Sequence, residues 1–504
     1  MENRSYIAAI DLGESTVVVI VGIKDRDGNI AIQAVASAPS EGVKAGQIEN
    51  IALVGDSIKS AVAEVENKLG INILEAYAGI SGEFVRCARH NDFVFVGDPQ
   101  NGVSQADVNA LFERMRNVHA PDGETIMERI PQNFIVDDEH EVRNPVGSFG
   151  RRLSSTFNFI LCANTPMQRL EMALRRTGIR MIKSYSNALA VADAVLSYDE
   201  KNEGVAVVDI GGGVTDIAIY YHNVLRYIAS IPIGSKSIDR DLRSMMIPEA
   251  LVEKIKCTHG SAISELAPEG KAVRVLARTP RGESKDILLR NLATAIEART
   301  SDIAEFVKQE VRDSGYNNKL TYGIVLTGGA ANLKNIDMLF SRITGIESRI
   351  ALPEERITAE TRALVASAAY STAVGLLIKG ADMGPCVTSD KPKREGENPH
   401  IVERKVVLPP TNPENERSAA QRGKGQELPS RDGAAAQKPI PEPVKPLRPE
   451  PPKPEPKPEE VVVAPDESAE VDEPKKGSNK WGDFISKTVG KIYDKISSND
   501  DVEI

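Results

Sequence analysis

A glycine-rich segment at residues 207–216 constrains the fold of this chain more than any other feature. It reads Val-Val-Asp-Ile-Gly-Gly-Gly-Val-Thr-Asp, and an apolar run at residues 217–221 follows it. The β-branched run before Asp209 predicts a buried strand, and the glycines predict a tight turn into the next strand. Backbone amides without a neighbouring Cβ can approach a ligand closely and bind phosphate oxygens. A glycine-rich hairpin with no ligand is the alternative if the segment is taken alone.

Two other segments repeat parts of this pattern. Residues 7–16 end a strand in Asp11-Leu12-Gly13, and a second strand is expected over residues 17–22. Residues 323–333 predict a buried strand, a Thr-Gly-Gly turn and the start of a helix. A duplicated hairpin predicts two similar lobes that hold one phosphate chain between them. The third turn would then hold an adenosine.

Size and composition narrow the class of protein. The chain has 504 residues, enough for more than one domain, and residues 1–380 alternate strand-like and helix-like patterns, which predicts an α/β protein. A net charge of −10 argues against general binding of nucleic acid, which needs a basic surface. The four cysteines show no metal-ligand spacing and indicate reduced thiols in a cytosolic protein. We expect no signal peptide, because the N-terminus leads directly into a strand.

The composition changes at about residue 381. Most of the chain's 30 prolines lie between Pro385 and Pro474, mixed with Lys, Glu, Ala and Gln. Such a segment cannot bury enough apolar surface to fold and favours extended conformations. We expect a flexible tether here; a proline-rich ligand for a signalling module is the alternative.

Residues 480–497 predict a short amphipathic helix after the tether. At about 100° per residue, the apolar side chains share one half of the helical wheel, and lysines lie along one flank. The apolar set is Trp481, Phe484, Ile485, Val489, Ile492, Tyr493 and Ile496, and the lysines are Lys480, Lys487, Lys491 and Lys495. This pattern predicts a helix in the interface of an anionic membrane, with packing onto the folded body as the alternative. We find no apolar run of the roughly 18 residues that a spanning helix needs.

The three turns, in this order, resemble the actin-like ATPase superfamily, and within it the chain resembles the FtsA family of bacterial cell-division proteins. Residues 79–82 (GISG) resemble the short glycine motif before that family's inserted domain. Residues 130–134 (IPQNF) and 143–147 (RNPVG) resemble paired motifs within the insertion, and residues 256–260 (KCTHG) resemble a helix end. The proline-rich linker with its amphipathic helix is the fourth shared feature.

The resemblance implies a two-lobed actin-like ATPase fold of the α/β class with an inserted subdomain 1C. Subdomain 1A would comprise residues 5–83 and 163–200, and subdomain 1C residues 84–162. Subdomain 2A would comprise residues 201–237 and 301–380, with subdomain 2B at 238–300. A disordered linker at 381–479 and the amphipathic helix at 480–497 would complete the chain.

The resemblance also implies ATP and Mg²⁺ as cofactors. The first phosphate hairpin would contain Asp11, Gly13 and Ser15, and the second Asp209, Gly211, Gly212, Gly213 and Thr215. The adenosine turn would be Gly328, Gly329 and Ala330, where Ala330 replaces a glycine of the family. Lys256 would reach toward the adenosine from subdomain 2B. Asp11 and Asp209 would hold Mg²⁺ through water.

The first hairpin departs from the family pattern, which usually reads Asp-x-Gly-Thr-Ser-Lys. Here Glu14 replaces the hydroxyl residue and Thr16 replaces the lysine, so two units of charge change in the unfavourable direction beside a polyphosphate. At about 6 Å and an effective dielectric near 20, each unit is worth a few kcal/mol before screening. We expect weaker ATP binding than in a typical relative, unless Glu14 turns outward.

The sequence offers no clear group to position water for hydrolysis. In actin-like filament proteins that group comes from the connecting helix, here residues 184–190, which contain no acid and no glutamine. Asn187 could orient a water but is a poor base, and Asp193 is more readily interpreted as a surface residue. We therefore expect at most a slow ATPase in which ATP mainly holds the two lobes together.

The resemblance implies a nucleotide-dependent membrane adaptor at the division site, on the cytoplasmic face of the bacterial cell membrane. The body would polymerise into filaments, and subdomain 2B would bind the C-terminal peptide of the tubulin-like protein FtsZ. Subdomain 1C would face neighbouring subunits and later division proteins. Two alternatives share the fold: a small-molecule kinase for a sugar or acetate, and a type IV pilus adaptor, whose family lacks the NPVG insertion.

Overall fold

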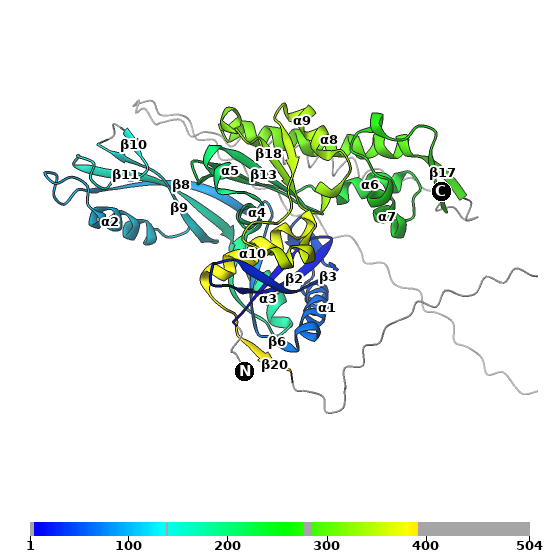
Figure 1. The fold of residues 1–504 in the computed structure, drawn as a ribbon, viewed down its shortest axis with the longest axis horizontal. Coiled ribbons are helices and arrows are strands. Elements are labelled where there is room, and N and C mark those ends of the chain that lie inside the picture. Colours follow the sequence, from blue (N-terminus) through cyan, green and yellow to red (C-terminus); the bar gives the residue numbers. More distant parts are fainter. Residues whose placement is uncertain (1–4, 138–139, 277–283, 392–504) are drawn as a thin grey trace, which may run out of the picture. The chain divides into compact units, whose positions relative to one another are not determined.

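The computed structural model describes residues 5–137, 140–276 and 284–391, drawn in colour in Figure 1. These residues fall within one compact unit, residues 1–402. The expected linker and the expected membrane helix at 480–497 lie outside the described residues, apart from the first part of the linker.

The first lobe contains a five-stranded sheet whose central strands are apolar on both faces. Its strands are β1 (Tyr6–Leu12), β2 (Thr16–Lys24), β3 (Ile30–Pro39), β7 (Glu75–Ile80) and β12 (Arg180–Ser186), in the order β12-β7-β1-β2-β3. Helix α1 (Ile51–Leu69) packs on β2 and β3, and α10 (Ser371–Met383) packs on β1 and β2. The buried runs of β1 and β2 therefore form the core of this lobe.

The second lobe repeats this topology. Its strands are β13 (Val205–Ile210), β14 (Thr215–Tyr221), β15 (Val224–Ile231), β18 (Ile324–Thr327) and β19 (Ser348–Ile350), in the order β15-β14-β13-β18-β19. In both lobes an antiparallel three-stranded meander is followed by two strands parallel to the first. The register also agrees, because Asp11 lies opposite Val18 and Asp209 lies opposite Asp216. The predicted duplication of the hairpin thus extends to the whole sheet.

A separate four-stranded sheet is inserted after β7. It contains β8 (Val85–Phe95), β9 (Glu124–Val136), β10 (His140–Val142) and β11 (Arg152–Ala163), in the order β10-β9-β11-β8. Helix α2 (Gln105–Arg116) packs on it, and its N-cap residue Ser104 forms a capping box with Asp107. Leu111 and Phe157 contribute to small cores of its own. We call this part subdomain 1C.

A second small core lies beside the sheet of the second lobe, in a part of that lobe that we call subdomain 2B. Helices α6 (Lys236–Ser244) and α7 (Glu249–His259), the hairpin of β16 (Ala272–Leu276) and β17 (Ser284–Leu288), and the first turns of α8 (Leu289–Asp313) form it. Leu242, Val252 and Leu292 are among its buried residues.

The remaining elements are short and connect these parts. The helices are α3 (Asn164–Arg176), α4 (Asn187–Val195), α5 (Tyr198–Glu203) and α9 (Ile336–Thr344), and the strands are β4 (Val43–Lys44), β5 (Gln47–Ile48), β6 (Ile71–Ile73) and β20 (Thr388–Asp390). Short 3-10 helices cover Ser264–Leu266, Asn317–Lys319, Gly329–Asn332, Ala359–Val365 and Ala368–Tyr370.

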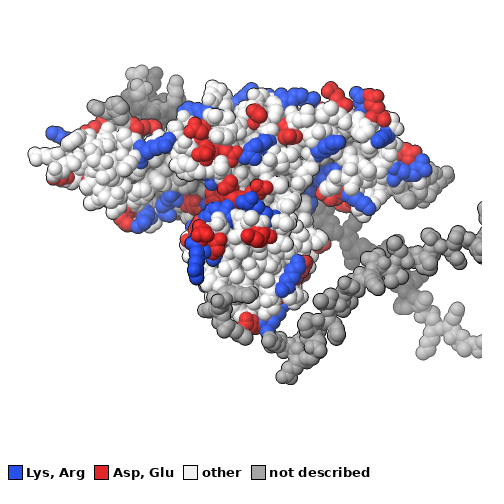
Figure 2. All heavy atoms as spheres, viewed as in Figure 1, with Lys and Arg blue, Asp and Glu red and all other residues white. Residues whose placement is uncertain are grey.

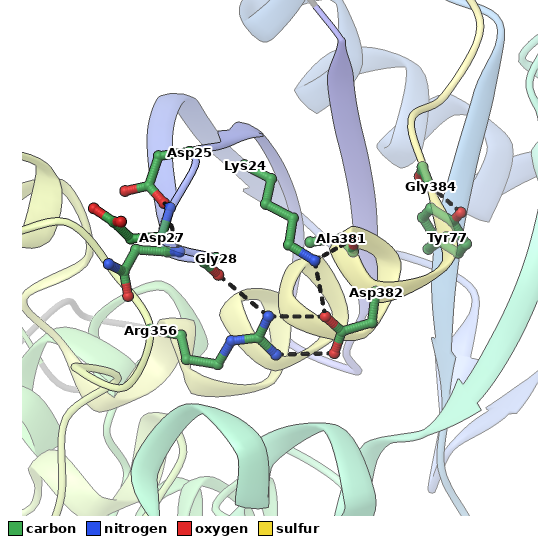
Figure 3. Close-up of polar contacts among 10 residues, drawn as sticks. Lys24, Asp25, Asp27, Gly28, Tyr77, Arg356, Ala381, Asp382 and Gly384 are labelled. Atoms are coloured by element: carbon green, nitrogen blue, oxygen red, sulfur yellow. Dashed lines mark hydrogen bonds and ion pairs between the residues drawn. The ribbon is translucent and has the colours of Figure 1, made fainter.

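The folded region continues past residue 380, so the predicted start of the linker at 381 is wrong. Helix α10 runs to Met383, and β20 pairs with β6 of the first lobe. The Tyr77 hydroxyl donates to the Gly384 carbonyl at 2.9 Å (Figure 3), and the Cys386 amide donates to the Tyr6 carbonyl at 2.8 Å. The composition of this region predicts an unfolded linker, but its first residues form a short segment that tertiary contacts stabilise.

A polar network joins the loop after β19 to the first lobe (Figure 3). The Arg356 guanidinium donates to both oxygens of Asp382, at 2.8 and 2.9 Å, and to the Gly28 carbonyl at 3.2 Å. Lys24 donates to the same carboxylate at 3.3 Å. The chain returning from the second lobe is therefore fixed to the β2–β3 turn before it enters α10.

Lys and Arg side chains alternate in small groups with Asp and Glu on the face drawn in Figure 2. Within residues 5–137, 140–276 and 284–391, no single helix is long and apolar enough to cross a membrane. One pair of helices with a bend between them, Ala359–Val365 and Ala368–Met383, is long and apolar enough when the two are taken together.

Candidate functional site

A cavity of about 370 Å³ lies where the two glycine hairpins face each other. Both lobes and subdomain 2B contribute to its walls. All but one of the predicted nucleotide-site residues line it: Asp11, Gly13, Ser15, Asp209, Gly211, Gly212, Gly213, Lys256, Gly328, Gly329 and Ala330, together with Asn187. The structure thus brings together segments that lie far apart in the sequence, from Asp11 to Ala330.

The two hairpin turns share one geometry. The Gly13 amide donates to the Thr16 carbonyl at 3.0 Å, and the Gly211 amide donates to the Val214 carbonyl at 2.9 Å. The turns approach each other so closely that a Cβ on Gly212 would lie 2.3 Å from the Ser15 hydroxyl oxygen. A side chain at 212 would therefore crowd the opposite lobe. Because the Gly211 amide is used within the turn, the amides of Gly212 and Gly213 are the ones that this turn leaves for a ligand.

Three aspartates form the polar floor of the cavity. Burial raises the pKa of Asp11 to about 7, and the negative charges of Asp209 and Asp216 add to this effect. Burial and the charge of Asp209 likewise raise the pKa of Asp216 to about 7. Among the described residues, no cationic side chain bonds to any of the three carboxylates. A buried negative cluster of this kind fits a divalent cation, although no group of three described acidic, His or Cys residues forms a direct metal cage.

Hydroxyl groups hold two of these carboxylates in place. Thr372, at the start of α10, donates to Asp209 Oδ2 at 2.5 Å. Ser81 donates to Asp216 Oδ2 at 2.5 Å from the first lobe, and Ser230 of β15 donates to Asp216 Oδ1. The Asp216 carboxylate therefore bonds to both lobes.

The turn after β18 is shaped by Asp209. Gly328 has φ 86°, and a Cβ there would lie 2.1 Å from Asp209 Oδ1 and 2.7 Å from the Ile210 carbonyl. Only glycine fits both the conformation and the space. The turn continues into the 3-10 helix Gly329–Asn332, so the predicted strand, turn and helix start are confirmed, with a 3-10 helix as the first helical element.

Lys256 lies on α7, one turn before the helix ends at His259. It forms ion pairs with Asp239 at 2.7 Å and with Glu253 at 2.6 Å. Burial lowers the pKa of Lys256, but the two acids outweigh burial and the net shift is upward. The ammonium thus remains charged at the wall of the cavity.

Thr215 departs from the prediction. Its side chain is fully buried, its hydroxyl donates to the Ile233 carbonyl at 2.8 Å, and it does not line the cavity. Successive side chains of a strand point to opposite faces, so Thr215 faces the core while Asp216 faces the cavity. Asp216 lines the cavity and is absent from the residues predicted from the sequence, although it ends the motif at 207–216.

Asn187 and Asp193, the two side chains considered for positioning water, lie in different surroundings. Asn187 begins α4 at the cavity wall, and its buried Oδ1 has no hydrogen-bond partner. Gly79 makes room for it, since a Cβ there would lie 2.2 Å from that oxygen. Asp193 lies outside the cavity lining and is half-buried between Lys201 and Lys379, at 2.8 and 3.1 Å, so it is part of an ion-pair network and not a simple surface residue.

Glu14 does not turn outward to solvent. Its Oε2 accepts a hydrogen bond from the Ala45 amide at 2.6 Å, and its Oε1 lies 3.7 Å from Lys236 Nζ of the second lobe. Lys236 also donates to the Glu14 carbonyl at 2.7 Å. The opposite lobe thus supplies the cation that the first hairpin lacks at Thr16.

Two family models match this chain. The model described as Cell division protein FtsA matches residues 206–375, and the model described as SHS2 domain inserted in FTSA matches residues 82–161. The cell division protein FtsA of Pseudomonas aeruginosa is 31% identical over 407 residues, which cover 78% of this chain and 96% of that protein. The chain belongs to the FtsA family.

Other comparisons agree with membership of the FtsA family. FtsA of Bacillus subtilis is 31% identical over 354 residues, covering 70% of this chain and 80% of that protein. The solved PilM-PilN type IV pilus biogenesis complex has a chain with a TM-score of 0.51 at 15% identity, covering 75% of this chain and 99% of that one. That likeness shows the fold alone. The predicted actin-like fold with an inserted subdomain is confirmed, and this FtsA-family chain is a cell-division actin homologue.

Proposed function

We propose that the cavity binds ATP with Mg²⁺. The observation that carries this proposal is the pair of facing hairpins with a buried carboxylate cluster that no described cation neutralises. Gly211 would shape the turn, the amides of Gly212 and Gly213 would bind phosphate oxygens, and Asp11 and Asp209 would hold the hydrated metal. The turn at 328–330 and Lys256 would contact the adenosine.

Turnover would be slow at most. Asn187 is the side chain placed to orient a water, and its unpartnered oxygen could accept one hydrogen bond. An amide is no proton acceptor of useful strength, so it would position the water without activating it. ATP would act mainly by favouring the closed arrangement of the lobes through differential affinity.

Calorimetric titration with ATP and Mg²⁺ tests the site. Asp209→Ala removes the metal carboxylate and should abolish measurable binding, whereas Thr215→Val, which alters a hydroxyl outside the cavity, should leave affinity within about twofold. Each variant is first checked for folding by circular dichroism. Unchanged retention of nucleotide by a folded Asp209→Ala protein would contradict the proposed site.

On the scale of the cell, we propose a membrane adaptor of the division machinery. ATP-bound bodies would form filaments, and the helix at 480–497 would bind the cytoplasmic face of the membrane at the division site. One such helix binds marginally, so filaments would raise the effective affinity by multivalency. Subdomain 2B would receive the FtsZ C-terminal peptide, and subdomain 1C would contact neighbouring subunits and later division proteins. A pull-down with an FtsZ tail peptide tests the first of these contacts.

A further inference from the structure

Subdomain 1C is inserted in the first lobe, where the base of its sheet packs, and it also bonds to the second lobe. Its strands β8 and β9 pack on β15, the edge strand of the second lobe's sheet. At the centre of this contact lie Asn158 of β11, which is 1% exposed, and Arg226 of β15, which is 5% exposed. We call this contact the 1C junction.

A β-bulge in β15 creates the acceptors of the 1C junction. The register with β14 shifts between Ile219, which lies opposite Tyr227, and Tyr220, which lies opposite Leu225, so Arg226 is the extra residue. A bulge turns a strand locally and re-aims its side chain. Here the Asn158 amide nitrogen donates to the carbonyls of both Leu225 and Arg226, at 3.3 and 3.2 Å.

Arg226 completes the 1C junction with groups from the insertion. Its guanidinium donates to Gln132 Oε1 and to Asn133 Oδ1, each at 3.1 Å, and to the Tyr221 carbonyl at 3.1 Å. Gln132 in turn donates to the Leu225 carbonyl at 3.0 Å. No described carboxylate hydrogen-bonds to this buried cation, so neutral oxygens of subdomain 1C provide most of its solvation. Separation of 1C from the second lobe would leave it uncompensated.

The same strand reaches the nucleotide cavity. Ser230, four residues after Arg226 on β15, donates to Asp216 Oδ1, and Ser81 donates to Asp216 Oδ2. Ser81 lies just before β8, the first strand of subdomain 1C. Ser230 and Ser81 therefore connect the Asp216 carboxylate to subdomain 1C, the first through β15 and the second through the segment before β8.

We propose that occupancy of the cavity is transmitted to subdomain 1C through Asp216, strand β15 and the 1C junction. A metal–phosphate group beside Asp209 changes the charge that Asp216 faces, and Asp216 holds the end of β15 and the entry into 1C. Subdomain 1C follows the second lobe, so its outer surface responds to nucleotide. This inference rests on the proposed nucleotide binding and adds the route by which the cavity controls the insertion.

Hydrogen–deuterium exchange of the full chain, with and without ATP and Mg²⁺, tests the inference. In the wild type, ATP should slow exchange in the hairpins at 11–16 and 209–216, and also in β9 and β15. Gln132→Ala should keep the response of the hairpins and lose that of β9. Ser230→Ala breaks the route at its other end and should give the same result. It provides the test if Gln132→Ala perturbs folding. By linkage, the two variants should also change the affinity for ATP by about fivefold.

Arg114→Met is the matched control, because it breaks an exposed ion pair with Asp92 within 1C and touches no residue of the second lobe. It should respond to ATP as the wild type does. Protection of the wild-type hairpins with no change in β9 would overturn the inference and leave the proposed nucleotide binding intact. A β9 response that persists in both variants would overturn the route. No protection of the wild-type hairpins would instead refute nucleotide binding, and the inference with it.

Discussion

At the scale of single residues, the Glu14–Lys236 pair lies beside the first hairpin, where the pattern implied by the family resemblance has a hydroxyl residue and a lysine. The acid comes from the first lobe and the cation from the second, with 3.7 Å between Glu14 Oε1 and Lys236 Nζ. The unfavourable charge change read from the sequence is therefore offset across the cavity. We expect ATP binding to depend on this cation.

Lys236→Met should weaken ATP binding about fivefold, because Glu14 would then face the phosphates without its partner; the pair is partly exposed, which limits the effect. Glu14→Gln in the same chain should restore most of the loss, since it removes the unpaired charge. Calorimetry of the two single variants and the double variant gives the coupling directly. Additive effects would show that the two side chains act independently.

The buried aspartates should make the nucleotide-free protein less stable as the pH rises. Asp11 and Asp216 have pKa values raised to about 7 in the folded state, so the folded protein holds protons that the unfolded chain releases. For one such group the free energy of unfolding should fall by roughly 2 kcal/mol between about pH 5 and about pH 8. Urea denaturation in EDTA measures this slope.

Asp11→Asn should flatten the pH dependence and stabilise the nucleotide-free protein at high pH, while it impairs binding of ATP with Mg²⁺. The pKa of Asp193 behaves in the opposite way to that of Asp11. Although this carboxyl is also buried, nearby lysines hold its pKa below the ordinary value of an aspartate. A slope that is unchanged in Asp11→Asn would mean that this carboxylate is ionised throughout.

At the scale of secondary-structure elements, β20 belongs to the folded body. It pairs with β6, the Val387 amide donates to Glu75 Oε2 at 3.0 Å, and Cys386 is buried. A chain that ends at Met383 should lose roughly 3 kcal/mol of stability through these hydrogen bonds and this burial. Differential scanning calorimetry should show a melting temperature lower by a few degrees. A chain that ends at Lys391 should melt like the full-length body, and equal melting of both truncated chains would contradict the assignment of β20.

Elements whose contacts are local could be predicted from the sequence, and elements that depend on distant contacts could not. Each hairpin closes within eight residues, so its Asp-x-Gly pattern sufficed for the strands, the turns and the cavity. The Thr372–Asp209 and Ser81–Asp216 bonds join residues 163 and 135 positions apart, and no local pattern marks them. The family resemblance assigns Thr215 to the second phosphate hairpin, whereas the alternation of side chains along the strand turns Asp216 toward the cavity.

At the scale of the whole molecule, the proposed adaptor needs the C-terminal segment for membrane attachment. The full chain should float with anionic liposomes in a density gradient, and a chain that ends at Gly477 should remain at the bottom. Replacing Lys487 and Lys491 with glutamate should weaken flotation strongly, since each lysine near the surface contributes about 1 kcal/mol. Equal flotation with and without the segment would contradict a membrane role for residues 480–497.

The two lobes repeat each other, and one pair of matched positions that differs between them has a consequence of its own. Where the second hairpin carries Asp216, the first carries Val18 at the matching place in its register. An isopropyl group accepts no hydrogen bond and carries no charge, so the proposed route through Asp216 has no counterpart at position 18 of the first hairpin. The two hairpins are therefore alike in how they would hold a ligand and different in how they would pass on its presence. We expect an acid at position 18 to connect the cavity to the first lobe as well.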